Sequence, residues 1–382
     1  MRSRIIALSL LLIFVSGSFA QKGEKPIRIF GYFQNQFLQQ GDPNRQRDQN
    51  SFLLQQLNLF FQKSISKRWA AFINFELINN FSSSRQWGSF NVEEAWVKYR
   101  LNKNFQLKLG LLIPTFNHLN AIKNRTPLLP YVTRPLVYEA SLDFIPLEEF
   151  VPERAFIQAY GVLPLQSVKF DYALYAGNSP NISTLQSNGQ SGLDTTNTFL
   201  FGGRVGLRLL NNIKAGVSLT HEKTNQFQRN FPEFVDALEK IGRLRFGADL
   251  SFQFSQFFFE GEYISVEYDE RARIIEFDKQ FYYGTIGWRP RENLVLYGSY
   301  WRTRSNQNQR PEVADGAPTP PLNEIRNYKR TVKSPSFGAA YTIHDRIVLK
   351  AQYVNINRKT NDPDISTGRD FNVYNLAVSV NF

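Results

Sequence analysis

The stretch Arg243–Phe254, RLRFGADLSFQF, alternates between two kinds of side chain. One side of it is apolar: Leu244, Phe246, Ala248, Leu250, Phe252 and Phe254. The other side is charged or polar: Arg243, Arg245, Asp249, Ser251 and Gln253. Successive side chains of a strand point to opposite faces, so this period of two predicts a β-strand. An apolar face opposite a charged face is typical of a strand that separates lipid from a wet barrel interior.

The same alternation recurs along the chain, and we count about 16 candidate strands of roughly 8 to 14 residues. They cover Ile27 to Leu38, Phe52 to Gln62, Trp69 to Asn79, Val92 to Leu101, Phe105 to Ile113, Ala155 to Leu163, Val168 to Ala176, Phe199 to Leu210, Ile213 to Glu222, Arg243 to Phe254, Phe257 to Tyr268, Phe281 to Trp288, Leu294 to Arg302, Phe337 to Thr342, Ile347 to Ile356 and Phe371 to Phe382. The sequence therefore predicts an all-β chain.

The connections between these strands alternate in length. Short joins, such as Asn102-Lys103-Asn104 and Asn211-Asn212, have the residue types that suit tight turns. Long joins, such as Pro114 to Arg154 and Thr303 to Ser336, lie between the short ones. Short periplasmic turns and long external loops are typical of an up-and-down outer-membrane barrel. We therefore predict a transmembrane antiparallel β-barrel of about 16 strands.

A large periplasmic β protein with one wet face is the alternative, because it would show the same alternation. Open sheets rarely exceed about 10 strands and leave unpaired edges, which favours the barrel. An even strand number also lets the last strand pair with the first. The chain ends on the alternating stretch Tyr374–Phe382, YNLAVSVNF. We expect Phe382 to act in barrel closure and assembly, since a terminal aromatic after such a stretch resembles the signal by which the barrel assembly machinery recognises its substrates.

The composition agrees with a membrane barrel and limits the available chemistry. The chain has no cysteine, so neither disulfides nor a thiolate metal site can form. Aromatic residues make up 15% of the chain, with 34 Phe, yet 20% of the residues are charged. These values conflict in a soluble protein with a single core. They agree in a barrel that turns apolar groups toward outer-membrane lipid and polar groups toward its interior.

The first residues are typical of a cleavable secretory signal. Arg2 and Arg4 precede the apolar run Ile5 to Val15, which is followed by the ending Ser18-Phe19-Ala20. The run is shorter than the about 20 apolar residues that a membrane helix needs, which disfavours an N-terminal anchor. We predict a signal peptide over 1–20, export through the secretory pathway, and one barrel domain over 21–382 in the outer membrane of a Gram-negative bacterium.

Two stretches resemble the phosphate-selective porins of the O and P type. Val92–Arg100 (VEEAWVKYR) and Leu107–Phe116 (LKLGLLIPTF) give an acidic-aromatic strand, a short turn, a strand ending near a glycine, and a Pro-x-Phe entry to the third long loop. The likeness continues into Thr133–Tyr138, TRPLVY. The resemblance implies a 16-stranded trimeric porin whose third loop folds into the lumen.

The join Pro114 to Arg154 is the longest in the chain, and loops beyond about 15 residues are usually functional or disordered. Its many apolar residues, from Leu128 to Leu147, need a surface to pack against. We expect this third long loop to fold into the barrel lumen. A loop folded over the mouth or against a neighbouring subunit is the alternative.

Basic residues are the candidate pore-lining and anion-binding groups. Those on the third long loop and on the inward faces of strands are Lys123, Arg125, Arg134, Arg204, Arg208, Arg243, Arg245, Lys98 and Arg100. The acids opposing them are Glu76, Glu94, Asp171, Asp249, Glu260 and Glu262. A basic excess in a low-dielectric pore would concentrate anions. The alternative is that arginines and acids form ladders that only stabilise the wall, and phosphate specificity would need several bidentate guanidinium contacts at one level.

Other activities find little support in the residue inventory. Only three histidines are present, His118, His221 and His344, so we predict no enzyme, although a hydrolase using His118 or His221 is left open. Acidic pairs such as Asp362 and Asp364 lack the spacing of an EF-hand, so no metal and no cofactor are expected. Basic residues are spread over the strands without a contiguous basic stretch, which argues against nucleic acid as a partner.

The sequence thus predicts a porin that lets small hydrophilic solutes diffuse passively across the outer membrane, with a leaning to anions such as phosphate. The resemblance adds a homotrimer. Two alternatives stay open: a channel for other solutes such as sugars or carboxylates, and a loop-plugged accessory or adhesion barrel without conductance.

Overall fold

The computed structural model describes residues 26–41, 49–80, 89–123, 125–139, 150–152, 154–179, 198–210, 212–225, 240–268, 277–309, 326–361 and 370–382. The predicted signal peptide, residues 1–20, lies outside these described residues, as do Asp362 and Asp364. No helix in the described ranges is long and apolar enough to cross a membrane.

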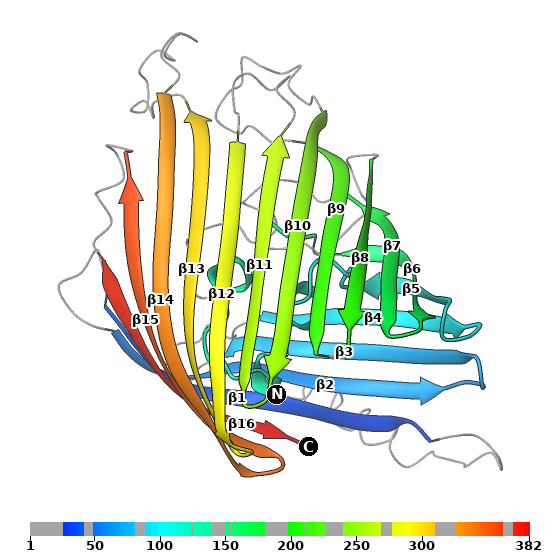
Figure 1. Cartoon of the computed structure of the whole chain (residues 1–382), viewed down its shortest axis with the longest axis horizontal. Helices are drawn as coiled ribbons and strands as arrows, with labels where there is room; N and C mark the ends of the chain where they lie inside the picture. Colours follow the sequence, from blue (N-terminus) through cyan, green and yellow to red (C-terminus); the bar gives the residue numbers. More distant parts are fainter. Residues whose placement is uncertain are drawn as a thin grey trace, which may run out of the picture.

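In the described part of the chain, sixteen strands form one sheet that closes on itself, and each strand is antiparallel to both neighbours. The strands are β1 (Arg28–Gln40), β2 (Gln49–Ser64), β3 (Trp69–Asn80), β4 (Ser89–Arg100), β5 (Gln106–Leu112), β6 (Ala155–Leu165), β7 (Val168–Asn178), β8 (Phe199–Leu209), β9 (Ile213–Asn225), β10 (Lys240–Phe254), β11 (Phe257–Tyr268), β12 (Phe277–Arg291), β13 (Leu294–Gln309), β14 (Arg326–His344), β15 (Ile347–Thr360) and β16 (Phe371–Asn381). Neighbours in sequence are neighbours around the barrel (Figure 1). The predicted 16-stranded antiparallel barrel is confirmed.

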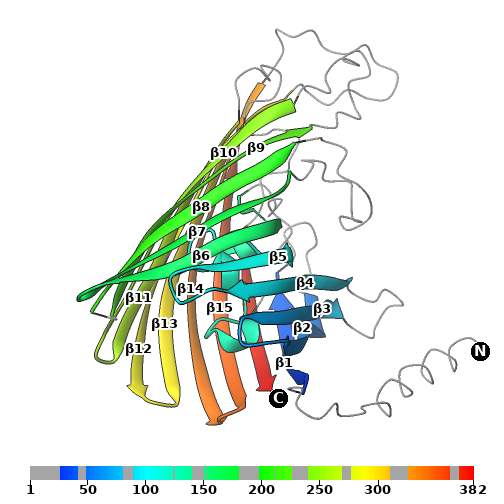
Figure 2. The ribbon, with the colours of Figure 1, turned by 90° about the vertical axis from the view of Figure 1, so that its right-hand side faces the viewer.

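The helical structure in the described residues is short and lies between β5 and β6. It consists of the 3-10 helices η1 (Asn120–Ile122), η2 (Thr126–Leu128) and η3 (Leu136–Tyr138). Figure 2 shows these turns behind the strands β4 and β5. They belong to the longest connection of the chain, which positions the candidate site.

The two faces of the sheet differ as the alternation predicts. On β10, Leu244, Phe246 and Leu250 are exposed on the outside, whereas Arg243 and Asp249 are buried on the inside. Exposed apolar side chains continue this outer surface on other strands: Phe201, Val205, Leu207, Val217, Leu219, Ile286, Trp288, Leu349, Leu376 and Val378. The outside therefore suits lipid, and the polar groups of these strands face the interior.

The sheet closes between β1 and β16. Gly31 and Phe382 exchange two backbone hydrogen bonds, each 3.0 Å long. The ring of Phe382 covers Gly31, where an added Cβ would come within 2.7 Å of a ring carbon. Its centroid lies 6.4 Å from that of Phe33. Because glycine has no Cβ, the Phe382 side chain fits directly over the seam.

β14 begins earlier than the sequence indicates. The alternation predicted a strand from Phe337, whereas β14 starts at Arg326. Between Arg326 and Ser336 polar and charged residues occupy both faces, so the period of two is lost. The pairing with β13 nevertheless continues as far as Gln309 opposite Arg326. Polar groups on both faces suit a strand that rises beyond the apolar band of a membrane.

Candidate functional site

The connection between β5 and β6 lies against the inner face of β11–β16. Its described residues are 113–123, 125–139, 150–152 and 154. Their buried apolar side chains are Phe116, Leu119, Leu136, Val137, Tyr138, Phe150 and Val151. They form one cluster with inward side chains of the strands, which we call the apolar wall: Ile264, Val266, Phe281, Tyr283, Trp301, Val332, Val354, Ile356, Phe371 and Val373. Hydrophobic burial therefore stabilises the connection against this side of the barrel.

Two glutamates of β11 anchor the connection by hydrogen bonds. The Glu262 carboxylate accepts bonds from the Tyr138 hydroxyl at 2.7 Å and from the backbone N–H of Leu119 at 2.6 Å. Tyr131 donates its hydroxyl hydrogen bond to Glu260. Burial raises the pKa of the Tyr138 phenol well above its usual value, so this group keeps the proton that it donates. Both acids predicted on β11 thus hold the connection.

β15 supplies a second set of anchors. The Lys350 Nζ lies 2.9 Å from the carbonyl oxygen of Thr126, 3.1 Å from that of Pro127 and 3.3 Å from that of Tyr131. The Gln352 side-chain oxygen accepts backbone N–H groups of residues 132 and 133 at 2.8 and 2.7 Å. Buried backbone groups outside regular structure need such partners. Lys350 and Gln352 therefore fix the path of residues 126–133.

A glycine on β10 lets the start of the connection approach the wall. The Asn117 side chain lies over Gly247, where an added Cβ would collide with it. The backbone N–H of Asn117 donates to the Ser218 hydroxyl at 2.9 Å, and its amide nitrogen donates to the Tyr263 carbonyl at 3.2 Å. Asn117 has a φ of 52°, in the left-handed region that Asn tolerates. The contact is possible because residue 247 is a glycine and has no Cβ.

The predicted wall arginines Arg204 and Arg208 are paired with carboxylates. Arg204 makes two bonds to Asp249, at 3.0 and 2.7 Å, and one to Asp171 at 2.6 Å. Arg208 donates to the other oxygen of Asp171 at 3.2 Å. The guanidinium of Arg204 crosses Gly216 on the intervening strand β9, where a Cβ would collide with it. The structure therefore brings Arg204 and Arg208 into one ion-pair cluster.

Arg243 and Arg245 form a second cluster around one acid. Both guanidinium groups pair with Glu222 on β9, and all three side chains are at most 1% exposed. The Ser179 hydroxyl donates to the other oxygen of Glu222 at 3.2 Å. Four predicted pore-lining arginines thus have carboxylate partners inside the wall. This arrangement favours the structural alternative for them, and their predicted binding of anions stays a prediction.

The predicted basic residues of the connection lie in three different settings. Lys123 is buried, and its carbonyl oxygen accepts a bond from Arg134 at 2.6 Å. Arg134 also lies 3.6 Å from Glu139. Arg125 is exposed at the start of η2. Of these three residues, Arg125 presents the most accessible charge.

The predicted residues Lys98 and Arg100 lie near the short turn from β4 to β5, and Arg100 is exposed. The Lys98 Nζ lies 5.9 Å from the centroid of the Trp96 ring, and the Lys108 Nζ of β5 lies 4.5 Å from it. Cations at such distances are attracted by the ring face. Trp96 also ends a row of rings whose neighbouring centroids are 4.8 to 5.6 Å apart: Tyr32, Phe60, Phe72 and Trp96. This side of the barrel therefore combines aromatic and basic groups.

Acidic side chains lie beside that row on β3 and β4. Glu94 accepts a bond from the Trp96 indole N–H at 2.7 Å, and Glu76 accepts one from Gln56 at 2.8 Å. Glu93, which is not among the predicted acids, lies 3.5 Å from Arg154. No set of three or more His, Asp or Glu side chains that could hold a metal ion occurs among the described residues.

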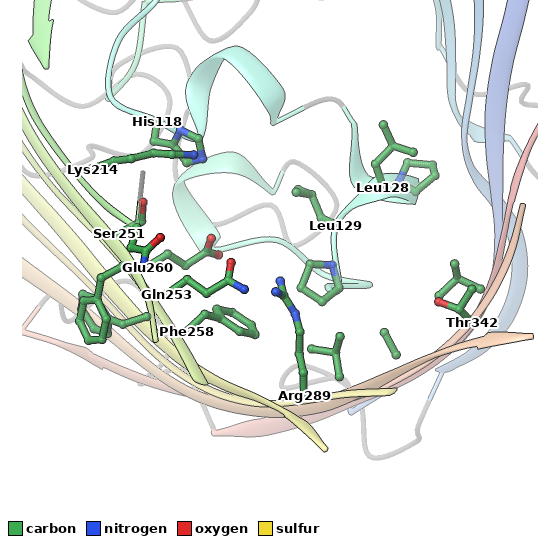
Figure 3. A pocket seen from close by; sticks show the side chains of 18 of the residues that line it. His118, Leu128, Leu129, Lys214, Ser251, Gln253, Phe258, Glu260, Arg289 and Thr342 are labelled. Carbon is green, nitrogen blue, oxygen red and sulfur yellow. The ribbon is translucent and has the colours of Figure 1, made fainter. Parts of the chain in front are cut away.

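A cavity of about 430 Å³ lies between the wall and the tip of the connection, residues 127–130. Figure 3 shows His118 and Lys214 on one side, Leu128 on the other, and Arg289 pointing in from β12. Within the part of the chain that the structure describes, neither Lys214 nor Arg289 has an ion-pair partner. Burial, and then the charge of Lys214, lower the pKa of His118, so its imidazole is neutral at pH 7. The cavity is thus lined by two cations that form no ion pair with any described residue.

Arg289 is not among the predicted site residues, because the strand predicted from the alternation ends at Trp288 and a short join begins at Arg289. The inward series Phe281, Tyr283, Thr285 and Gly287 leads directly to Arg289, and β12 in fact extends to Arg291. Continuing the period of two by one step from Gly287, past Trp288, would have placed Arg289 inside.

Comparisons with known proteins define the fold. No protein-family model matches the chain, and no curated protein matches it in sequence. Among solved structures, the anion-selective porin from Comamonas acidovorans is similar with a TM-score of 0.61 and 13% identity, over 94% of this chain and 99% of that one. The chain has a closed, porin-like β-barrel fold. The outer-membrane channel DcaP of Acinetobacter baumannii has a TM-score of 0.57 at 14% identity, over 95% of this chain and 99% of that one.

OmpT, an outer membrane protein of Vibrio cholerae, is also similar: its loop L8 deletion mutant gives a TM-score of 0.58 at 10% identity, over 94% of this chain and 99% of that one. A trimer form of OmpT is among the similar structures. These likenesses agree with the porin-like part of the resemblance. Its phosphate-selective part is matched by no family model.

The prediction that the chain is not an enzyme is wrong as an exclusion. OmpT stands beside the porins among the similar structures, and at these identities the likeness concerns the fold alone. A fold does not decide whether a site on it performs chemistry. The small number of histidines was insufficient ground, because one of them, His118, lines the cavity.

Proposed function

We propose that the protein is an outer-membrane channel through which small hydrophilic solutes diffuse passively, with a preference for anions such as phosphate. The observation that carries the proposal is the closed barrel with an apolar outside and charged side chains inside. A polar interior is useful only to a barrel whose interior meets water or polar ligands. A porin-like fold is consistent with such a channel.

The anion preference is supported by cations that lack carboxylate partners. Lys108, Arg125, Lys214 and Arg289 have no ion pair among the described residues. The wall arginines, in contrast, are neutralised by nearby acids. Unpaired cations in a channel with low-dielectric walls raise the local concentration of anions. They, rather than the arginine clusters, would set the selectivity.

The connection between β5 and β6 is the proposed constriction. Its packing on the apolar wall and against β2, β9 and β10 would leave the path of the solute on the side of β3–β8, past Lys108 and Trp96. The trimer form of OmpT supports a homotrimer as the proposed assembly state. Outer-membrane lipid would cover the apolar outside, and Phe382 at the seam would present the terminal signal to the barrel assembly machinery.

Planar-bilayer conductance tests the proposal. In a chloride salt gradient, an anion channel gives a reversal potential displaced toward the chloride equilibrium potential, and phosphate reduces the chloride current. Lys108→Gln should lower this displacement, whereas Lys103→Gln, which removes the same charge from the exposed β4–β5 turn, should not. A cation-selective current would contradict the anion preference.

A plugged barrel without conductance is the second candidate. The extensive contact of the connection with the apolar wall and with Lys350 favours it, because such a segment cannot leave without exposing buried groups. Purified protein that inserts in the bilayer but carries no current would favour the plugged barrel over the channel.

A further inference from the structure

We propose that the cavity under the tip of the β5–β6 connection binds small organic acids that join one carboxylate to an apolar body. The entry of such ligands rests on the proposed channel function, but their binding does not. The cavity is distinct from the arginine clusters of β8–β10, whose charges are already paired.

The charged part of the site comes from two wall strands. Lys214 lies on the inner face of β9 and Arg289 on that of β12. The guanidinium carbon of Arg289 lies 5.0 Å from the centroid of the Phe258 ring, which orients it toward the cavity. Gln253 adds an amide to the lining. A planar carboxylate matches the fork of an arginine and leaves Lys214 as a point charge.

The charge count favours a monoanion. Lys214 and Arg289 supply two positive charges, and the acid in the lining is Glu260, which accepts a hydrogen bond from Tyr131. His118 adds no charge at pH 7, because burial lowers its pKa. With Glu260 ionised, the net charge of about +1 balances one carboxylate and leaves a phosphate dianion partly uncompensated.

The apolar part of the site is the tip itself. Leu128 is 54% exposed although it lies inside the barrel. Its neighbours Leu129 and Pro130 line the cavity, and Val295 and Val348 line it from the strands. Covering exposed apolar surface stabilises a complex. An acid with an apolar body would cover Leu128, whereas an inorganic anion would not.

Equilibrium binding tests the inference independently of conduction. Benzoate is titrated into the full-length protein in detergent micelles by calorimetry, beside acetate, benzyl alcohol and inorganic phosphate. Benzoate should bind more tightly than all three. Acetate lacks the apolar ring, benzyl alcohol lacks the carboxylate charge, and phosphate lacks the ring and carries excess negative charge. Equal binding of benzoate and acetate, or tighter binding of phosphate, would overturn the inference.

Matched variants locate the site. Arg289→Gln should weaken benzoate binding about tenfold, the usual effect of losing a charged hydrogen-bond donor. Arg302→Gln removes the same charge from the outer face of the next strand and should leave it unchanged. Leu128→Ser should weaken benzoate but not acetate, and Arg289→Lys should recover part of the affinity, which a mere folding defect would not allow. If Arg289→Gln binds benzoate like the wild type, the assigned site is wrong.

The outcomes separate this inference from the proposed function. If the protein conducts but does not bind benzoate preferentially, the proposed channel function stands and the proposed binding site is refuted. If the protein binds benzoate at Arg289 but carries no current, the proposed binding site stands and the proposed channel function is refuted.

Discussion

Replacing Glu222 with glutamine should destabilise the barrel more than other single changes of charge in its wall. Glu222 is the shared partner of Arg243 and Arg245, and the three side chains are at most 1% exposed. Removing one partner of a buried pair typically costs about 3–5 kcal/mol, because the other charge stays buried without compensation. Here two guanidinium groups lose the same carboxylate, so we expect the upper part of that range. Such a loss lowers the folding equilibrium constant by roughly three orders of magnitude.

The assay is urea-induced unfolding from lipid vesicles, followed by tryptophan fluorescence with folding and unfolding branches that coincide. Glu267→Gln is the matched control, because Glu267 is exposed on the outer face of β11, and its effect should stay within about 0.5 kcal/mol. A loss below about 1 kcal/mol for Glu222→Gln at an unchanged denaturant slope would refute the reasoning. It would mean that water or another group compensates the two arginines.

Three further outcomes follow from the contacts described. Lys350→Met removes the ammonium that holds the tip of the β5–β6 connection, so amide hydrogen exchange of residues 126–133 should rise at least tenfold, whereas the exposed Lys359→Met should not change it. Deleting Phe382 should reduce the yield of folded barrel several-fold while molecules that do assemble conduct normally; normal insertion would count against the seam. Because the pKa of His118 is lowered in the folded protein, the unfolded chain binds more protons between that lowered pKa and about pH 6.5. The free energy of unfolding should therefore be highest above about pH 6.5 and fall as the pH drops through the lowered pKa. His118→Asn should flatten this part of the pH profile in the same urea assay.

The fold was predictable because lipid imposes a local rule. On β10, Leu244 and Phe246 must face the hydrocarbon and Arg243 and Arg245 must avoid it, so side-chain order alone gives the faces. The number of strands follows from counting such stretches. Strand ends were less predictable, as β14 shows, because the rule applies only within the apolar band of the membrane.

The partners of the inward charges were not predictable, because they depend on the register and tilt of strands. Arg204 reaches Asp249 two strands away, and it does so across Gly216. Nothing near Arg204 in sequence indicates that acid. A single glycine on the strand between them decides the contact, and its role depends on the exact pairing of β8, β9 and β10.

The apolar wall left a trace in the sequence that the simple alternation rule overlooks. In β11 and β15, the inward positions Ile264, Val266, Val354 and Ile356 are aliphatic instead of polar. Inward positions that contact only water are expected to be polar. Apolar residues on the inward face of a barrel strand therefore indicate where another part of the chain will pack.

The contact between the β5–β6 connection and the apolar wall also limits how this barrel can be re-engineered. The two surfaces are separated by more than a hundred residues in sequence, yet each buries the other. Grafting the connection alone into a barrel whose inner face is polar would place Phe116, Val137 and their apolar neighbours against polar side chains. Exchanging the wall alone would leave the resident connection equally mismatched. For chimaeras with other barrels of this fold, the connection and the inner positions of β11–β16 form a single module that has to be moved together.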